Sequence, residues 1–417
     1  MIKLGFMFSG QGSQYKGMGY LADRFKIAQC IFDQASDILG YDLLSVMNDS
    51  NPNVLQQTEY AQPAIFTYSY AWYQILKENY NIKPVCGAGH SLGEFTALTC
   101  SGVLSFDDAL TLVNKRGQLM QQAAENSFGG MAAIKGLHRS IIEEVCSLLS
   151  KGDRLVQISN INTEDQIVIS GENSKVRQAS DKLAKLGGTV YPVHVSAPFH
   201  TPYMASANAQ LLDILSQINF ADGEWPVIGN VTAKPYVSLD DIRTGISHHM
   251  LHPVRWSDSM DWMLRQGVNT FIEIGPRSAL RNMMKQTLPH IDAFSCEEHD
   301  NQIAELMSEY NQPKYVTLLS ACLSTALLVP NRNNNREEYE YGALQPLKEL
   351  STLEAKSQEK KLKETDAEQR ETLRLFQRII TTKKVDEDEI FDYFFQVSIK
   401  SAIPIKKLMQ LMGGERL

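Results

Sequence analysis

Apolar and polar positions alternate at the start of the chain and predict a first β-strand. The sequence reads Ile2-Lys3-Leu4-Gly5-Phe6-Met7-Phe8, a pattern typical of a strand buried on one face. A glycine-rich turn over residues 9–14 ends this strand. Apolar residues then recur at helical spacing over residues 27–39, 64–76 and 106–124. The first part of the chain therefore predicts an α/β arrangement.

A second region, from about residue 129 to 195, predicts a small α+β unit. Its hydrophobic pattern indicates strands at 131–134, 166–171 and 189–195 and helices at 141–149 and 174–186. This β-α-β-α-β order in a short span is typical of a unit inserted into a larger domain. Two later apolar stretches, 225–231 and 270–274, predict buried strands where the chain returns to that domain.

The pattern changes again past about residue 313. The apolar stretch from 315 to 330 is too short to span a bilayer and predicts a buried or docked helix. Residues 331–340 predict a polar loop, and 348–384 are rich in Lys and Glu. Thr365 and Glu368 form a capping-box pattern ahead of an apolar stripe, and a further helix starts near Asp386 and stops at Pro404. We expect three or four helices here.

Composition narrows the class of protein. The 417 residues are 43% hydrophobic and 21% charged, as in ordinary globular proteins, and the net charge of −8 argues against nucleic-acid binding. The six cysteines are scattered with no C-x-x-C, which favours a reducing compartment and argues against a zinc site. The N-terminus lacks a signal-peptide pattern. We expect a cytoplasmic protein with no membrane attachment and no metal.

The candidate chemistry centres on Gly89-His90-Ser91-Leu92-Gly93, a G-x-S-x-G nucleophile elbow between a predicted strand and a helical run. In that setting the serine hydroxyl stands on a sharp turn. The next N–H and the helix N-terminus then face a developing oxyanion. A plain glycine turn is the alternative.

A nucleophilic serine needs a base and oxyanion donors. Among nine histidines, His200 lies in a loop just after a predicted strand, and the order of serine before histidine is that of α/β hydrolases. A lone histidine is, however, more often a satisfied core or surface residue. The Leu92 N–H is one oxyanion donor, and Gln11 supplies a second if the first strand lies beside the elbow strand.

Arg116 is a candidate for binding a carboxylate. It lies on the helix predicted after the elbow, where a guanidinium can hold a carboxylate near the serine in a bidentate way. Taken alone, a solvated helix arginine is the commoner explanation.

Nine sequence segments, in order, resemble the malonyl-CoA:acyl-carrier-protein acyltransferase family and cover residues 1 to about 295. They are Phe8–Gln14, Ala61–Ala64, Gly89–Glu94, Arg116–Gly117, Gly130–Ile134, Gln166–Gly171, Ser196–His200, Pro253–Trp256 and Glu273–Pro276. The resemblance implies an α/β-hydrolase-like large domain, residues 1–127 and 197–312, with an inserted ferredoxin-like small domain, residues 128–196. Residues 313–417 then form a C-terminal helical extension.

The resemblance also implies a role for each matching residue. Ser91 matches the nucleophile, His200 its base, and Arg116 the partner of the malonyl carboxylate. Gln11 and Leu92 match the oxyanion donors. The family orients its histidine through a backbone carbonyl, here that of His249, and the matching substrate-binding positions include His90 and Phe199. Phe199 and Leu92 resemble malonyl-selective members, whereas Pro198 departs from the commonest malonyl pattern.

The implied reaction moves a malonyl group from malonyl-CoA, a substrate, to the phosphopantetheine thiol of an acyl carrier protein or synthase carrier domain, with no bound cofactor. The C-terminal helical extension and residues 196–200 resemble those of stand-alone acyltransferases in polyketide and hybrid lipopeptide pathways. Antibiotics are among the products expected of such pathways. Two alternatives remain at this stage. One is an acyl hydrolase that clears stalled carrier proteins, and the other is a non-catalytic docking protein of a synthase.

Overall fold

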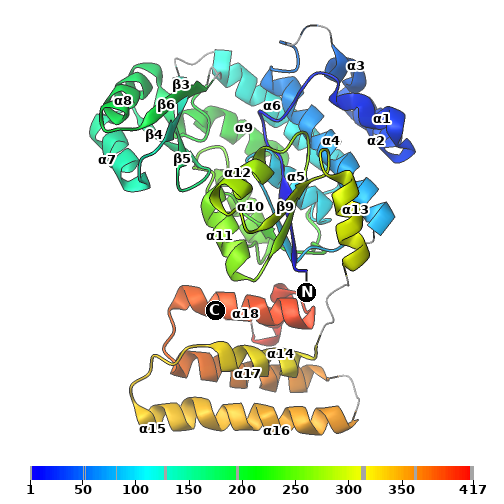
Figure 1. The fold of residues 1–417 in the computed structure, drawn as a ribbon, viewed down its shortest axis with the longest axis vertical. Coiled ribbons are helices and arrows are strands. Elements are labelled where there is room, and N and C mark those ends of the chain that lie inside the picture. The colour runs from blue at the N-terminus through cyan, green and yellow to red at the C-terminus, as the bar shows by residue number, and fades with distance from the viewer. Residues whose placement is uncertain are drawn as a thin grey trace. The chain divides into compact units, whose positions relative to one another are not determined.

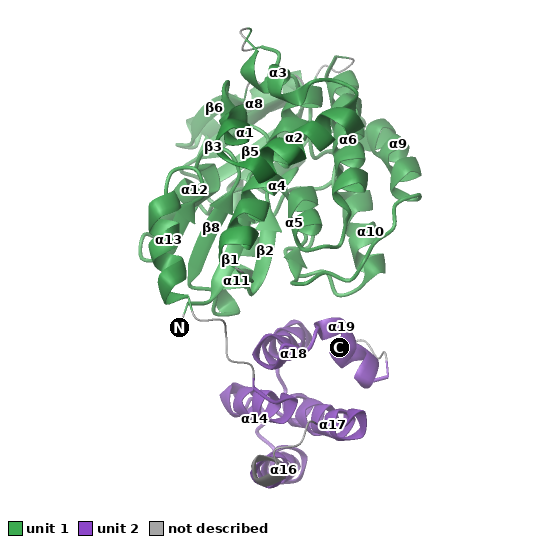
Figure 2. Cartoon of the chain, turned by 90° about the vertical axis from the view of Figure 1, so that its right-hand side faces the viewer, with its two compact units in different colours: residues 1–312 green, residues 313–417 purple. Residues whose placement is uncertain are grey.

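The computed structural model describes residues 2–49, 51, 53–80, 82–125, 129–193, 197–310, 316–360 and 364–413, without the side chains of 357–360. The chain forms two compact units, residues 1–312 and 313–417 (Figure 2). The boundaries expected at 127/128, 196/197 and 312/313 fall at or beside residues outside the described ranges.

The main sheet of unit 1 has five parallel strands in the order β7-β2-β1-β8-β9. Its strands are β1 (Leu4–Phe8), β2 (Cys86–Gly89), β7 (Val227–Ile228), β8 (Thr270–Ile274) and β9 (Asp292–Ser295). Figure 1 labels β9 and the helices around this sheet, and Figure 2 shows β8, β1 and β2 side by side. All five residues of β1 are buried, so the expected half-buried strand was wrong. The reason is its central place in a parallel sheet, which is buried on both faces.

The other expected strands of this sheet differ in length. The prediction for 270–274 is confirmed by β8, whereas only Val227–Ile228 pair within the predicted stretch 225–231. The sequence pattern did not predict β9.

Helices surround this sheet. They are α1 (Leu21–Arg24), α2 (Lys26–Leu39), α3 (Leu43–Asn48), α4 (Thr58–Tyr80), α5 (Gly93–Cys100), α6 (Phe106–Glu125), α9 (Ala205–Leu215), α10 (Leu239–His248), α11 (Trp256–Arg265), α12 (Ala279–Thr287) and α13 (Asp300–Glu309). Short 3₁₀ turns lie at Met18–Tyr20 and Pro202–Met204. α5 packs on β1 and β2, and α4 packs along α6. α4 is apolar on nearly every side, as expected of a helix buried all round.

The second sheet of unit 1 has four antiparallel strands in the order β4-β5-β3-β6. These are β3 (Gly129–Lys135), β4 (Val156–Ile161), β5 (Gln166–Glu172) and β6 (Thr189–Val193), with α7 (Arg139–Leu149) and α8 (Asn173–Lys185). We call residues 129–193 the small subdomain. Its β-α-β-β-α-β order is the ferredoxin-like one, which confirms the predicted fold class.

The order of elements predicted from the hydrophobic pattern did not include β4, and a bulge in that strand explains the omission. The register of β4 against β5 shifts between Ile158 and Asn160, which interrupts the alternation of apolar and polar residues.

Unit 2 contains more helices than the three or four expected. They are α14 (Leu318–Leu328), α15 (Arg336–Tyr339), a π-helical turn (Glu340–Leu344), α16 (Gln345–Lys360), α17 (Asp366–Thr382), α18 (Glu387–Ser401) and α19 (Ile405–Leu411). α14 confirms the predicted buried helix, although residue 315 is outside the described ranges. The expected polar loop at 331–340 is wrong from Arg336 onward, where α15 begins. Among the described residues, no helix is long and apolar enough to cross a membrane.

Local signals in unit 2 are otherwise confirmed. Thr365 and Glu368 form the capping box of α17. The apolar stripe of α17, made of Leu373, Phe376 and Ile380, is buried, as are Phe394 and Val397 of α18. The rings of Phe376 and Phe394 meet edge to face. α18 ends at Ser401, ahead of Pro404.

Candidate active site

The serine of the elbow lies on a strained turn between β2 and α5. Ser91 has a φ of 49°, in the left-handed region that side-chain-bearing residues rarely adopt. A Cβ at Gly89 would lie 1.9 Å from the carbonyl of Gly93, and one at Gly93 would lie 2.1 Å from the Phe8 carbonyl oxygen. Only glycine fits at both positions, so the G-x-S-x-G pattern reflects close backbone contacts as well as the turn.

An asparagine that the sequence analysis did not single out holds the elbow. Asn230 Oδ1 accepts from the Ser91 N–H at 2.8 Å, and Asn230 Nδ2 donates to the Gly89 carbonyl at 2.6 Å. Asn230 follows β7, at the carboxyl end of a parallel strand, where functional groups of open α/β sheets gather. That position was the signal that could have identified it.

His200 lies against the serine. Its Nε2 is 2.9 Å from Ser91 Oγ, and its Nδ1 is 3.0 Å from the backbone carbonyl oxygen of His249. A carbonyl oxygen can only accept, so Nδ1 carries the proton and Nε2 is free to accept from the serine hydroxyl. The structure thus brings together Ser91, His200 and the His249 carbonyl with the geometry of a nucleophile, a base and an orienting group.

The imidazole of His200 is held neutral. Its side chain is buried, and burial together with the nearby Arg116 charge lowers the pKa of His200 to about 3. A neutral ring at physiological pH is the form that can accept a proton.

Arg116 is buried beside the same hydroxyl, with 1% of its surface exposed. Its Nη2 donates to Ser91 Oγ at 3.1 Å and its Nη1 to Gln62 Oε1 at 2.6 Å. The ion pairs among the described residues do not include Arg116, and its Nε has no hydrogen-bond partner there. Burial lowers the pKa of Arg116 to about 10, so the guanidinium is still charged at neutral pH. The solvated-arginine explanation does not hold for this buried side chain.

A chain of buried hydrogen bonds links Arg116 to the glycine-rich turn. Gln62 Nε2 donates to Thr58 Oγ1 at 3.1 Å, and Thr58 Oγ1 donates to Gln11 Oε1 at 2.6 Å. Gln62 lies in the motif Ala61–Ala64, for which the sequence indicated no chemical role. Gln62 holds one terminal nitrogen of the guanidinium while the other donates to Ser91 Oγ.

The segments that carry the two expected oxyanion donors lie next to each other. β1 pairs with β2 in parallel, with Phe8 opposite Gly89, so the condition for Gln11 is met. A Cβ at Gly10 would lie 2.3 Å from the His90 carbonyl oxygen, which shows how closely this turn approaches the elbow. The Leu92 N–H lies at the N-terminus of α5.

The remaining expected residues lie at the edges of this site. His90 Nε2 is 2.9 Å from Asn162 Oδ1 of the small subdomain, and its ring lies 5.7 Å from that of Trp256. Phe199 is buried in the core of the large sheet's domain, next to His200.

A buried carboxyl lies beneath the elbow. Glu94 accepts from the Asn230 N–H at 2.7 Å and from the Tyr236 hydroxyl, and its Oε2 is 3.5 Å from His249 Nε2. That last distance is too long for a strong hydrogen bond. Burial raises the pKa of Glu94 to about 7. Within the described ranges, no three His, Cys, Asp or Glu side chains gather as a metal site would require.

Comparisons with known proteins identify the relatives of this chain. Residues 5–322 match the acyl transferase domain family. A malonyl CoA-acyl carrier protein transacylase of Bacillus subtilis is 37% identical over 391 residues, covering 92% of this chain and 98% of the relative. Another, from Bacillus subtilis strain 168, is 39% identical over 289 residues, covering 69% of this chain and 90% of the relative.

Solved structures are similar over unit 1. The malonyl CoA-acyl carrier protein transacylase of Coxiella burnetii gives a TM-score of 0.70 at 33% identity, covering 73% of this chain and 96% of its own. A malonyl-transacylase in complex with a type II PKS acyl-carrier protein gives 0.70 at 34% identity, covering 73% and 99%. The chain therefore belongs to the acyl transferase domain family, among the malonyl CoA-acyl carrier protein transacylases.

Proposed function

We propose that this chain transfers a malonyl group from malonyl-CoA to the phosphopantetheine thiol of an acyl carrier protein, through a malonyl ester on Ser91. The observation that carries the proposal is the buried Arg116 guanidinium, without a carboxylate partner among the described residues, 3.1 Å from the nucleophilic oxygen. A buried charge is costly unless paired, and a malonyl carboxylate supplies the missing partner.

The first half-reaction begins when the malonyl carboxylate pairs with Arg116, which places the thioester carbonyl at Ser91. His200 Nε2 takes the Ser91 proton as Oγ attacks that carbonyl. The N–H groups of Gln11 and Leu92 stabilise the oxyanion, and each such donor typically contributes 10²–10³ in rate. The tetrahedral intermediate collapses, the C–S bond breaks, and CoA leaves with the proton from His200.

The second half-reaction runs through the same groups. His200, neutral again, takes the proton of the carrier's phosphopantetheine thiol as the sulfur attacks the malonyl-Ser91 ester. The oxyanion forms in the same place, and the Ser91 oxygen leaves with the proton returned by His200. Arg116 keeps the carboxylate in position throughout, and no step needs a bound cofactor.

The two alternatives have less support. A hydrolase acting on unsubstituted acyl groups has no use for a buried guanidinium at the nucleophile. A non-catalytic docking protein has no use for a strained serine 2.9 Å from a neutral histidine.

Unit 2 bears on the biosynthetic setting. The 391-residue match to the Bacillus subtilis relative is longer than unit 1, so it extends into unit 2, whereas the 289-residue match is shorter than unit 1. We infer that this chain resembles the stand-alone acyltransferases and serves polyketide or hybrid lipopeptide biosynthesis more than fatty-acid synthesis. All six cysteines are free, which favours the reducing cytoplasm as its location.

Replacing Arg116 tests the function and the choice of substrate together. Loss of a charge-assisted bidentate contact costs a few kcal/mol, so Arg116→Ala should slow malonyl loading by roughly 10² or more. Acetyl-CoA has no carboxylate to lose, so its loading should fall far less. Intact-mass measurement of Ser91 acylation by malonyl-CoA, acetyl-CoA and methylmalonyl-CoA, with and without holo carrier protein, gives both rates.

The matched control is Arg139→Ala, which removes a surface arginine paired with Glu143. It should leave both rates unchanged. Equal losses with malonyl-CoA and acetyl-CoA in Arg116→Ala would mean that Arg116 has only a structural role. A wild-type chain that gains no malonyl adduct would refute the proposed function itself.

The lysines of unit 2 offer little support for binding an acidic carrier protein through charge. Lys383 is buried and donates to the carbonyls of Ala326 and Val329, and Lys384 pairs with Glu338 at 3.1 Å. The side chains of three further lysines of the extension, at positions 360, 361 and 363, lie outside the described residues.

A chain truncated after residue 312 should still load malonyl onto Ser91 at close to the full-length rate, because every group proposed for the chemistry lies in unit 1. Transfer to the cognate carrier should be slower if unit 2 helps bind it. Loading and transfer are measured separately by mass spectrometry on folded protein. Transfer at the full-length rate would limit unit 2 to a stabilising or oligomerising role.

A further inference from the structure

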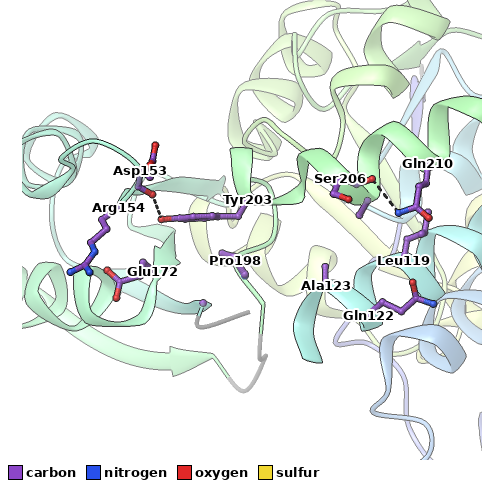
Figure 3. Close-up of a pocket in the computed structure, with 12 residues that line it drawn as sticks. Leu119, Gln122, Ala123, Asp153, Arg154, Glu172, Pro198, Tyr203, Ser206 and Gln210 are labelled. Atoms are coloured by element: carbon purple, nitrogen blue, oxygen red, sulfur yellow. Dashed lines mark hydrogen bonds between the residues drawn. The ribbon is translucent and has the colours of Figure 1, made fainter. Parts of the chain in front are cut away.

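The loop that carries His200 is held by side-chain hydrogen bonds across to the small subdomain. Gln157, on β4, donates through Nε2 to the backbone carbonyl of His200 at 3.1 Å. The Tyr203 hydroxyl donates to the Asp153 carbonyl at 2.6 Å and accepts from the Leu155 N–H at 3.1 Å. Figure 3 shows Tyr203 reaching from its loop to Asp153. The sequence analysis assigned no role to Gln157 or Tyr203.

The backbone of His200 needs such support. Its φ is 57°, in the left-handed region, and a residue with a side chain stays there only when its surroundings hold it. The bonds to Ser91 and to the His249 carbonyl act on the imidazole ring. The bond from Gln157 acts on the main chain of His200, and so on the position of the Cα that carries the ring.

Side-chain packing around the His200 loop is incomplete on the side that faces a cavity. A cavity of about 570 Å³ is lined by Pro198 and Tyr203 of the loop, by Leu119 and Ala123 of α6, and by Gly129 of β3 (Figure 3). Where side chains do not fill space, the loop lacks the dispersion contacts of a close-packed interior. Its position then depends more on the hydrogen bonds made by Gln157 and Tyr203.

β4 also bonds to the segment that follows His249, whose carbonyl orients the His200 ring. On β4, the Ser159 carbonyl accepts from the Val254 N–H at 2.9 Å, and the Ile161 N–H donates to the Val254 carbonyl at 2.8 Å. Val254 follows His249 by a short segment. β4 therefore bonds both to the main chain of the base and to the segment that follows the orienting His249 carbonyl.

We propose that Gln157 and Tyr203 are positioning residues that hold the His200 loop against the small subdomain, so that Nε2 stays within hydrogen-bond reach of Ser91 Oγ. The inference rests on the proposed function only in taking His200 as the base. It gives the small subdomain a part in setting up the base.

The test uses Gln157→Met and Tyr203→Phe in the full chain, singly and together. Each variant deletes hydrogen-bonding groups and keeps the size of the side chain. We expect the maximal rate of Ser91 loading to fall about tenfold in each, the cost of one lost positioning contact. The KM for malonyl-CoA should stay within about twofold of wild type, because Arg116 is untouched. Acetyl loading should fall by the same factor as malonyl loading.

The pH profile is the readout that a purely structural role would not move. Burial is the largest cause of the low pKa of His200, so a loosened loop should let that pKa rise and shift the acid limb of loading to higher pH. The groups around the ring are the Arg116 guanidinium of α6, the His90 imidazole of the elbow and the His249 and His252 segment after α10. None of these is changed in either variant.

The matched controls are Gln210→Met, whose amide donates to the Ser206 carbonyl of its own helix, and Tyr191→Phe, an exposed tyrosine of β6. Both should load at the wild-type rate. Wild-type rate and pH profile in Tyr203→Phe and Gln157→Met, in a chain that does load malonyl, would overturn the inference and leave the proposed function intact. A loss accompanied by a raised KM and an unmoved acid limb would overturn it as well.

Discussion

Ser91→Ala is expected to abolish the malonyl adduct while leaving the fold intact. The Ser91 hydroxyl is the group that both His200 Nε2 and Arg116 Nη2 approach, at 2.9 and 3.1 Å. Alanine keeps the Cβ and removes only the oxygen, so the elbow, clamped by Asn230, should still form. Intact-mass measurement after mixing with malonyl-CoA should show no gain in mass, and the thermal unfolding temperature should stay close to that of wild type.

Ser206→Ala is the matched control, because this serine of α9 is exposed. It should load normally. An adduct that persists in Ser91→Ala, at whatever residue peptide mapping locates it, would show that the nucleophile has been misassigned.

His200→Ala should slow both half-reactions, each by roughly 10²–10⁴, because a single base serves the serine and the carrier thiol in turn. The other described side chain that bonds to the serine hydroxyl is the Arg116 guanidinium, which is already protonated and cannot take its proton. Rapid-quench mass spectrometry with malonyl-CoA measures loading, and holo carrier protein added to preloaded enzyme measures transfer. Added imidazole should restore part of the loading rate, since the vacated space leads to Ser91 Oγ.

His290→Ala, which replaces an exposed histidine elsewhere in unit 1, should change neither rate. If His200→Ala loads at a near wild-type rate and loses only transfer, His200 is a docking residue and a different group is the base. If both rates are unchanged, the Ser91–His200 hydrogen bond has no part in the chemistry.

Local sequence patterns predicted much of the fold. α2, α6, β8 and the capping box of α17 lie where hydrophobic period and cap residues placed them. These features depend on a few neighbouring residues, so the chain segment contains the information. Predictions failed where tertiary context decides. β1 is buried on both faces because helices pack on both faces of its parallel sheet, and β4 is irregular because of its bulge against β5.

The candidate site shows the same division. Ser91 and its glycines could be recognised from five consecutive residues, because the turn itself imposes the steric demand. Asn230 offered only its place near the carboxyl end of a predicted strand. Gln62 offered no signal, because an amide side chain shows its role only when a partner from a distant segment meets it. His249 was expected only through its match to a family position, since a backbone carbonyl carries no residue-type signal.

By itself, the sequence determined the elbow, the α/β order of elements and the family, since motifs and periodicity are properties of short segments. Only the tertiary structure decided that Arg116 is buried at the serine, that His200 is neutral with its Nε2 free to accept, and that Gln157 and Tyr203 hold its loop. Those facts depend on burial and on distances between residues far apart in the chain. Folding sets both, because it removes water from the site and brings the segments together.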